Sequence, residues 1–156
     1  MELWDAYDKD FNIIDGKTLI RGEEIPDGMY HLVCDIYVRH IDGDVLLMQR
    51  DFNKTHGGLW EATAGGSALK GESPIECAKR ELFEETGIVS YELKEIGRVV
   101  CDNHRSLYVE FLAITNCNKE AICLQEGETI NFAWINEEKI NSFDERLVTK
   151  RILQFL

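Results

Sequence analysis

Residues 66–88 read GSALKGESPIECAKRELFEETGI, and this stretch decides the fold. It places three carboxylates, Glu81, Glu84 and Glu85, within five residues of a predicted helix. At about 100° per residue, with Glu81 at zero, Glu84 lies near 300° and Glu85 near 40°. The three carboxylates therefore share one helix face. Because like charges at this spacing repel, we expect a cation beside them, and oxygen ligands suit Mg²⁺ or Mn²⁺ better than zinc.

The helix is predicted from signals that do not depend on the glutamates. Ser73 and Glu76 have capping-box spacing, Pro74 occupies the first helical position, and Gly87 is placed to end the helix. An apolar stripe next to the acidic face is expected to pack inward, and it consists of Ile75, Ala78 and Leu82.

The same stretch also carries a longer pattern with fixed spacing. A glycine is followed by five residues, a glutamate, seven residues and then Arg-Glu-Leu-Phe-Glu-Glu-Thr-Gly-Ile. This pattern is the Nudix box, and the residues that fill its specified positions are Gly66, Glu72, Arg80, Glu81, Leu82, Glu84, Glu85, Gly87 and Ile88. The chain thus resembles a Nudix hydrolase. The resemblance implies an α/β (α+β) fold, an α/β/α sandwich with a curved mixed sheet, in which the box forms a loop–helix–loop.

The resemblance also implies roles for the residues of the box. Glu81, Glu84 and Glu85 correspond to metal ligands, with the main-chain carbonyl of Gly66 as a fourth. Glu81 is alternatively the general base, and three further base candidates lie outside the box: Glu61, Glu110 and Glu128. Arg80 and Glu72 correspond to a pair that braces the metal-binding carboxylates. The implied reaction is attack of water on a diphosphate, with Mg²⁺ or Mn²⁺ as cofactor.

Substrate contacts are predicted less fully than metal contacts. Arg50 ends a predicted strand and is a candidate phosphate clamp because its guanidinium matches phosphate oxygens; Lys54 and Arg39 are weaker candidates. Loops 51–58 and 100–106 are expected to select the substrate. Two tryptophans, Trp60 and Trp134, are expected in the core, and two loop histidines, His56 and His104, at the surface.

Composition predicts a single globular domain over residues 1–156. Hydrophobic residues make up 44% of the chain and charged residues 29%, while the net charge is −12. An acidic protein is a poor ligand for nucleic acid or an anionic membrane, and no apolar run approaches about 18 residues. We therefore expect a small-molecule diphosphate partner, no nucleic acid and no membrane. Because Nudix proteins are often dimers, the resemblance also allows a homodimer.

The five cysteines predict free thiols and a cytoplasmic location. Their number is odd, no CxxC motif occurs, and no secretory signal is visible. Three of them, Cys34, Cys101 and Cys123, lie in apolar runs and are expected to fill the core.

Hydrophobic patterns predict strands around the box helix. Six strands are expected, at residues 31–39, 44–50, 59–64, 93–102, 107–115 and 130–135. The first two flank an Asp42-Gly43 turn, and residues 1–27 are expected to be polar and rich in turns. Ser142 and Glu145 form a second capping box, which predicts a terminal helix with apolar residues Phe143, Leu147, Val148 and Ile152.

Two other functions were compared with hydrolysis. The N-terminal part is similar to isopentenyl-diphosphate isomerase, an enzyme that uses a cysteine five residues after the tryptophan of the strand before the box. Gly65 occupies that position here, and Ser67 replaces the family's metal-binding histidine, so isomerase chemistry is disfavoured. His31 matches another isomerase histidine and is expected to be structural. A catalytically silent nucleotide-binding Nudix module remains an alternative, although all box carboxylates are present.

Overall fold

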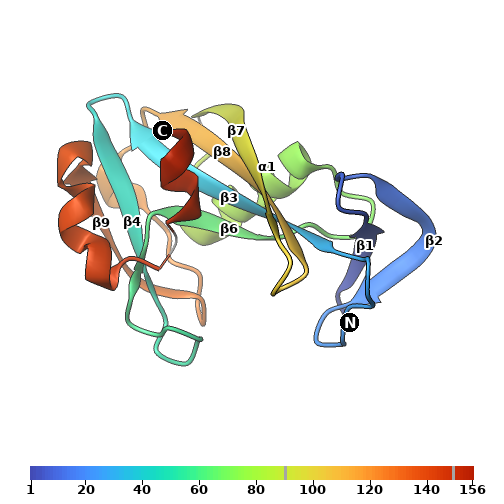
Figure 1. Ribbon diagram of the computed structural model, residues 1–156. Coiled ribbons are helices and arrows are strands. Elements are labelled where there is room, and N and C mark those ends of the chain that lie inside the picture. Colours follow the sequence, from blue (N-terminus) through green and yellow to red (C-terminus); the bar gives the residue numbers. More distant parts are fainter. Residues whose placement is uncertain (90, 149) are drawn as a thin grey trace.

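The protein is represented by a computed structural model that describes residues 1–89, 91–148 and 150–156 (Figure 1). Its strands are β1 (Leu3–Tyr7), β2 (Ile13–Ile20), β3 (His31–His40), β4 (Asp44–Arg50), β5 (Trp60–Glu61), β6 (Thr63–Ser67), β7 (Tyr91–Cys101), β8 (Ser106–Thr115) and β9 (Thr129–Asn136). The α-helix α1 spans Pro74–Thr86. The 3₁₀ segments are η1 (Lys119–Ala121), η2 (Glu137–Arg146) and η3 (Arg151–Phe155).

Strand β3 organises the main sheet. It runs parallel to β8 along its whole length, and β7 continues the sheet beyond β8 in the antiparallel direction. On its other side, β3 pairs with β4 at Arg39 and Val45, and its middle residues, Val33–Tyr37, pair with β6. Strand β4 then diverges to pair with β5 and β9. The sheet is therefore mixed and splits into two branches at β3, as the curved mixed sheet of the prediction requires.

The two faces of the sheet are covered by different parts of the chain. Helix α1 packs Ala78 and Leu82 onto one face, in a cluster with Ile36 and Phe111. The C-terminal segments pack on the opposite face, where Ile152 joins a second cluster. Figure 1 shows α1 behind the sheet and the C-terminal turn in front of it. This arrangement confirms the predicted sandwich.

The N-terminal prediction was only partly right, because residues 1–27 contain the expected turns and also the two strands of a hairpin. Strands β1 and β2 pair antiparallel, and the hairpin lies at one end of the molecule (Figure 1). Its own small core contains Trp4, Ala6 and Leu19. The ring of Trp4 stacks on His31 at 4.3 Å, which ties the hairpin to β3. In β1 and β2, apolar and polar residues alternate only over short stretches, and this signal was too weak to predict the strands.

The terminal helix was also predicted incorrectly. Segment η2 begins at Glu137, where the Asn136 side chain accepts from the Glu138 amide at 2.9 Å. The Ser142 hydroxyl donates to the Lys139 carbonyl inside this segment, so it does not cap a helix start. The Glu145 side chain of the expected capping box lies outside the described part of the structure. The apolar positions were nevertheless informative, because Leu147 and Ile152 are buried in one cluster.

The other predicted elements agree with the structure apart from local differences. The expected strand at 59–64 is two short strands, β5 and β6, with Ala62 buried between them. Ile75 was expected to pack inward but is 44% exposed, and Cys77 fills the inner position instead. Cys34 is buried as predicted, Cys101 is half-buried, and Cys123 is exposed because it lies in the loop beyond η1. All five cysteines are free.

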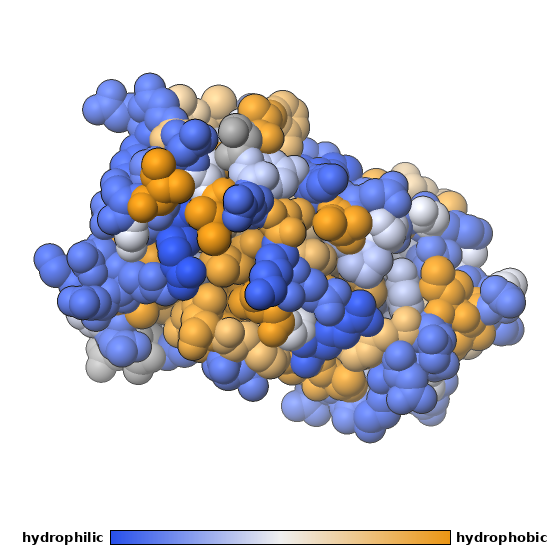
Figure 2. Space-filling model, turned by 90° about the horizontal axis from the view of Figure 1, so that it is seen from above, coloured by the Kyte–Doolittle hydropathy of each residue, from blue (hydrophilic) through white to orange (hydrophobic). Residues whose placement is uncertain are grey.

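Exposed apolar side chains occur in several parts of the described chain. Figure 2 shows apolar and hydrophilic residues interspersed on the face that is seen from above. The most exposed large apolar side chains come from four separate segments and are Met1, Ile41, Phe52 and Val89. None of the helices that the structure describes has the length and apolar character needed to cross a bilayer.

Candidate active site

Helix α1 is fixed at both ends by the residues that predicted it. The Ser73 hydroxyl accepts from the Glu76 amide and donates to the Glu76 carboxylate at 2.7 Å. Gly87 adopts a left-handed conformation, with φ of 77°, and its amide donates to the Phe83 carbonyl at 2.8 Å. A glycine has no side-chain penalty in this conformation, so the helix ends sharply after its acidic face.

The guanidinium of Arg80 connects the helix to the loop before it. It donates two hydrogen bonds to Glu72, from Nε at 2.7 Å and from Nη2 at 2.9 Å. Its Nη1 donates to Glu81 at 2.8 Å and to Glu84 at 3.2 Å, and Nη2 also reaches the Ser67 carbonyl. Burial alone would raise the pKa of Glu72, but the Arg80 hydrogen bonds hold it below its usual value. Arg80 thus positions the loop and two of the three carboxylates together.

Two glycines of β6 let the helix approach the sheet. A Cβ at Gly66 would lie 2.5 Å from the Glu81 carboxylate, and a Cβ at Gly65 would lie 2.1 Å from the Cys34 carbonyl of β3. The Gly65 amide also donates to Glu85 at 3.3 Å. Gly66 therefore leaves room for an acidic side chain, and Gly65 leaves room for the neighbouring strand.

The carboxylates line a polar pocket of about 250 Å³. Helix α1 contributes Arg80, Glu81, Glu84 and Glu85 to its wall. Two further lining residues, Lys54 and Glu128, were predicted from sequence as a phosphate clamp and a base candidate. The others were not predicted, and they are Gln125 and the hairpin residues Glu2 and Arg21. Since the pairing of β1 with β2 brings Glu2 and Arg21 together, their role could not be found without that hairpin.

The surroundings of the Glu85 carboxylate in this pocket disfavour its charged form. This side chain is only 6% exposed, and burial raises its pKa well above the usual value, with the charges of Glu61 and Glu81 adding to the shift. Burial also raises the pKa of Glu81, although Arg80 opposes the change. A site that holds several carboxylates against their desolvation cost is stabilised by a cation.

The donor set fits a hard divalent cation. Three carboxylates and the Gly66 carbonyl offer oxygen atoms only, which Mg²⁺ and Mn²⁺ prefer. Among the described residues, no three His, Cys, Asp or Glu side chains are grouped as a ready set of ligands. Arg80 accounts for this arrangement, because it holds Glu81 and Glu84 by ion pairs. Each ion pair engages one oxygen of its carboxylate, Oε1 of Glu81 and Oε2 of Glu84, so the second oxygen of each is not held by Arg80.

Arg50 lies beside the carboxylate pocket but not in its wall. Its Nη1 pairs with Glu61, and its Nε donates to the Thr55 carbonyl at 2.7 Å. Both Arg50 and Glu61 line a larger cavity of about 590 Å³, which also includes Thr55 and His56 of one predicted selector loop. Val100, Cys101 and His104 of the other selector loop line the same cavity.

The weaker substrate candidates and the aromatic residues have structural partners. Lys54 pairs with Glu128 at the rim of the carboxylate pocket, whereas Arg39 pairs with Glu137 at 2.7 Å. Trp60 packs against the second core cluster, and Trp134 packs against the first and donates to the Lys119 carbonyl. His56 and His104 are exposed, as predicted.

His31 has a structural environment. Its Nε2 lies 2.7 Å from the Ser106 hydroxyl, and its Nδ1 lies 3.3 Å from the Ser67 hydroxyl. Burial lowers its pKa to about 4, so the ring is neutral at pH 7. A neutral ring that stacks on Trp4 and bridges two hydroxyls agrees with the structural role expected for this residue.

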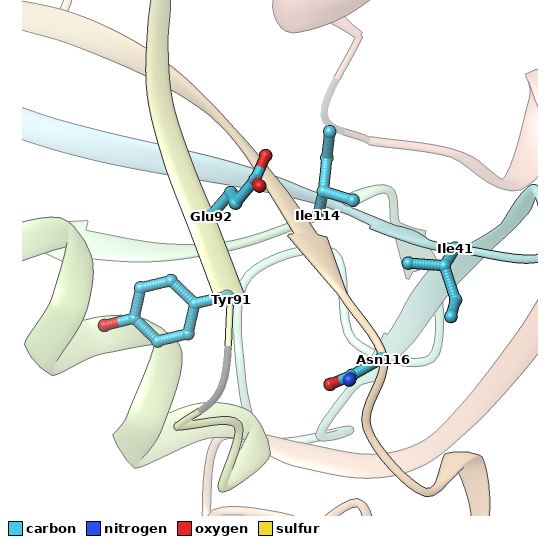
Figure 3. A pocket seen from close by; sticks show the side chains of 5 residues that line it. All are labelled: Ile41, Tyr91, Glu92, Ile114 and Asn116. Atoms are coloured by element: carbon cyan, nitrogen blue, oxygen red, sulfur yellow. The ribbon is translucent and has the colours of Figure 1, made fainter.

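A further pocket of about 320 Å³ lies at the start of β7 and is shown in Figure 3. Tyr91 and Glu92 leave the strand in opposite directions there, and Ile41, Ile114 and Asn116 form the remaining wall. Among the described residues that line this pocket, Glu92 is the one carboxylate, in contrast to the acidic cluster on the helix face.

Comparison with known proteins identifies the family. Residues 29–156 match the NUDIX domain model, so the chain belongs to the Nudix family. An uncharacterized Nudix hydrolase of Listeria innocua is 28% identical over 144 residues, which cover 91% of this chain and 84% of the relative. One from Listeria monocytogenes is 39% identical over 90 residues, covering 57% of this chain and 53% of the relative. The chain therefore spans about half of the latter protein.

Solved structures support the same fold. DR0079 from Deinococcus radiodurans has a TM-score of 0.74 at 14% identity, covering 92% of this chain and 89% of that one. The NUDIX domain of Shewanella oneidensis NrtR, complexed with ADP ribose, has a TM-score of 0.59 at 22% identity over 72% of this chain and 77% of that one. A Francisella tularensis NMN adenylyltransferase/ADP ribose pyrophosphatase, complexed with AMP and a Mn ion, has 0.58 at 18% identity over 76% and 38%.

Isomerases are also among the relatives. The isopentenyl-diphosphate isomerase of Serratia proteamaculans is 36% identical over 97 residues, covering 62% of this chain and 52% of that enzyme. The structure adds a physical reason against isomerase chemistry. A cysteine at position 65 would place its Cβ 2.1 Å from the Cys34 carbonyl, so the β3–β6 pairing has no room for the required side chain.

Proposed function

We propose that this chain is a metal-dependent pyrophosphohydrolase that cleaves the diphosphate linkage of a nucleoside diphosphate derivative or a nucleoside triphosphate. The observation that carries the proposal is the cluster of Glu81, Glu84 and Glu85 on α1, held against β6 and braced by Arg80 and Glu72. The two related structures described above that are complexed with ADP ribose and with AMP support a nucleotide substrate. A small-molecule substrate, a cytoplasmic location and a homodimer are part of the same proposal.

The proposed cation is Mg²⁺, with Mn²⁺ as an alternative, held by Glu81, Glu84, Glu85 and the Gly66 carbonyl. When bound, it would neutralise charge on the phosphoryl oxygens and lower the pKa of a water molecule. In the reaction, a water oxygen forms a bond to phosphorus, the bridging P–O bond breaks, and a carboxylate takes the proton from water. Arg80 and Glu72 keep the carboxylates in position.

The base remains a choice between four glutamates, and their positions differ. Glu81 and Glu128 line the carboxylate pocket, and Glu61 lies next to it in the larger cavity. Glu110 is fully buried under the C-terminal segment and has no direct access to the pocket. Location therefore favours Glu81, Glu128 and Glu61 over Glu110.

Substitution Glu84→Gln tests the proposal. We expect phosphate release from nucleoside di- and triphosphates, dinucleotide polyphosphates and nucleotide sugars in Mg²⁺ to fall by about 100-fold or more, because a charged group near the phosphoryl oxygens is lost. The matched control is Glu76→Gln, which changes the same residue type in the first turn of the same helix and is expected to keep full activity. Equal turnover in Glu84→Gln and wild type, with both proteins folded, would refute the assignment.

A further inference from the structure

A pair of buried acids lies on the sheet face opposite α1. Asp35 of β3 and Glu110 of β8 are neighbours in register and are 5% and 0% exposed. Their next neighbours on either side are Gly65 of β6 and Gly97 of β7, so no side chain flanks them within the sheet. The C-terminal segment covers the acids on this face of the sheet, and its Phe155 ring lies over Gly97.

A single N–H of the Arg151 guanidinium lies close to both acids. Its Nε donates to Asp35 at 2.9 Å and lies 3.4 Å from Glu110 Oε1. Neither oxygen of Glu110 has a hydrogen-bond partner among the described residues. Arg151 thus offers this pair one N–H between two carboxyl groups, whereas a ligand with two adjacent polar atoms would offer each of them a partner.

The acids adjoin the larger cavity through Arg151 and Tyr108. The Arg151 guanidinium lies 3.5 Å from the centroid of the Tyr108 ring, and both residues line that cavity. Arg50 and Glu61 line the same cavity on the side of the carboxylate pocket. Gly65, which pairs with Asp35, lines the carboxylate pocket, so the acids lie one strand away from the proposed metal site.

We propose that Tyr108, Asp35 and Glu110 form a recognition site for an amino-substituted nucleobase, cytosine or adenine, which would take the place of the Arg151 guanidinium. This inference rests on the proposed function, since it names the organic group of the same substrate. The base would stack on Tyr108 where the guanidinium now lies, and its nucleoside diphosphate part would extend toward α1.

A nucleobase can replace the Arg151 guanidinium because both groups are planar and have edges of similar shape. Cytosine and adenine each carry an amino group next to a ring nitrogen acceptor, and the N–C–N fragment has the shape of the Nε–Cζ–Nη edge of arginine. Burial and the charge of Asp35 raise the pKa of Glu110 well above its usual value, so the pair keeps one proton at pH 7. The amino group then donates to Asp35, while the Glu110 hydroxyl donates to the ring nitrogen. Uracil and hypoxanthine present a carbonyl in place of the amino group and would repel Asp35.

Ligands that differ at one position test the site. Binding of CMP and UMP, and of AMP and IMP, is measured by titration calorimetry with wild-type protein in EDTA. We expect the amino member of at least one pair to bind about 10- to 100-fold more tightly, because the oxo member leaves buried polar groups unpaired. A difference under about twofold in both pairs would overturn the proposal.

Two variants assign the preference to this site. Asp35→Asn replaces the carboxylate by a neutral amide, which can accept from an amino group or donate to a carbonyl, so we expect it to bind the amino and oxo members equally. The control Asp15→Asn, on the exposed side of β2, should keep the wild-type preference. A folded Asp35→Asn protein that retains the preference would overturn the assignment. If Asp35→Asn does not fold, Tyr108→Leu decides, since loss of base stacking should weaken both members by about tenfold or more. Unchanged binding in Tyr108→Leu would also overturn it.

The binding experiment is independent of hydrolysis because it contains no metal. A normal amino preference together with full activity of Glu84→Gln would refute the proposed function and leave the base site standing. Loss of activity in Glu84→Gln without any amino preference would refute the base site alone.

Discussion

At the residue scale, the two adjacent glycines of β6 make room for different neighbours. Gly65 lies against the backbone of β3, whereas Gly66 lies against the end of a flexible side chain, Glu81. A backbone carbonyl cannot move without breaking strand pairing, but a carboxylate can rotate. The same substitution at the two positions should therefore affect different properties.

Substitution of each glycine by alanine distinguishes the two effects. We expect Gly65→Ala to lower the free energy of unfolding by about 2–3 kcal/mol through overpacking, measured by urea denaturation. Gly66→Ala should change stability by less than about 1 kcal/mol but reduce turnover about tenfold or more, because it displaces Glu81. Equal stability of the two variants would contradict this distinction.

At the scale of elements, strands β3 and β8 hold two acids in one register position, which makes stability depend on pH. Burial, and then the charge of Asp35, raises the pKa of Glu110 in the folded protein. A carboxyl group whose pKa is raised on folding contributes stability below its ordinary pKa of about 4.5, and this contribution is lost as pH rises through the folded value. Arg151, which faces both acids, reduces the effect but does not reverse it.

Substitution Glu110→Gln removes this dependence. We expect its free energy of unfolding, relative to wild type, to increase between pH 5 and pH 9 by up to about 1.4 kcal/mol per pH unit. Urea denaturation at pH 5, 7 and 9 measures the difference. Glu95→Gln, an exposed glutamate on β7, is the control and should show a constant difference. A constant difference for Glu110→Gln would show that the carboxyl is ionised throughout.

Elements were predictable from sequence where the signal was local. Ser73, Pro74 and Gly87 mark the ends of α1 because caps act within one turn, and the glutamates follow from helical spacing. Residues of the site that depend on distant pairing were not predictable. Arg21 reaches the pocket through a hairpin, and Arg151 meets Asp35 across 116 residues. The cap of η2 is Asn136 and not Ser142, so the start of this segment was placed incorrectly.

The whole molecule joins its N-terminal hairpin to the main sheet by several contacts. The Lys70 amide donates to the Leu3 carbonyl at 2.8 Å, and the Gly71 amide donates to Asp5 at 2.8 Å. Tyr7 and Tyr30 exchange backbone hydrogen bonds at 2.9 Å. These contacts support the proposal that residues 1–156 form one domain.

One domain should unfold in one transition. We expect urea transitions followed by tryptophan fluorescence and by far-ultraviolet circular dichroism to coincide, since Trp4 reports on the hairpin and Trp60 and Trp134 on the sheet. In Trp4→Phe, fluorescence reports on the sheet alone and should keep the same midpoint as circular dichroism. Two separated transitions in wild type would show that the hairpin unfolds independently.

The place of the hairpin has a consequence for the design of new specificities. It lies outside the residues that match the family, 29–156, yet it supplies Glu2 and Arg21 to the rim of the carboxylate pocket. These two residues sit at the open end of the hairpin, where Arg21 pairs with Glu2. Exchanging the hairpin for another sequence would therefore alter the charge at the mouth of the pocket and leave the sequence of helix α1 unchanged.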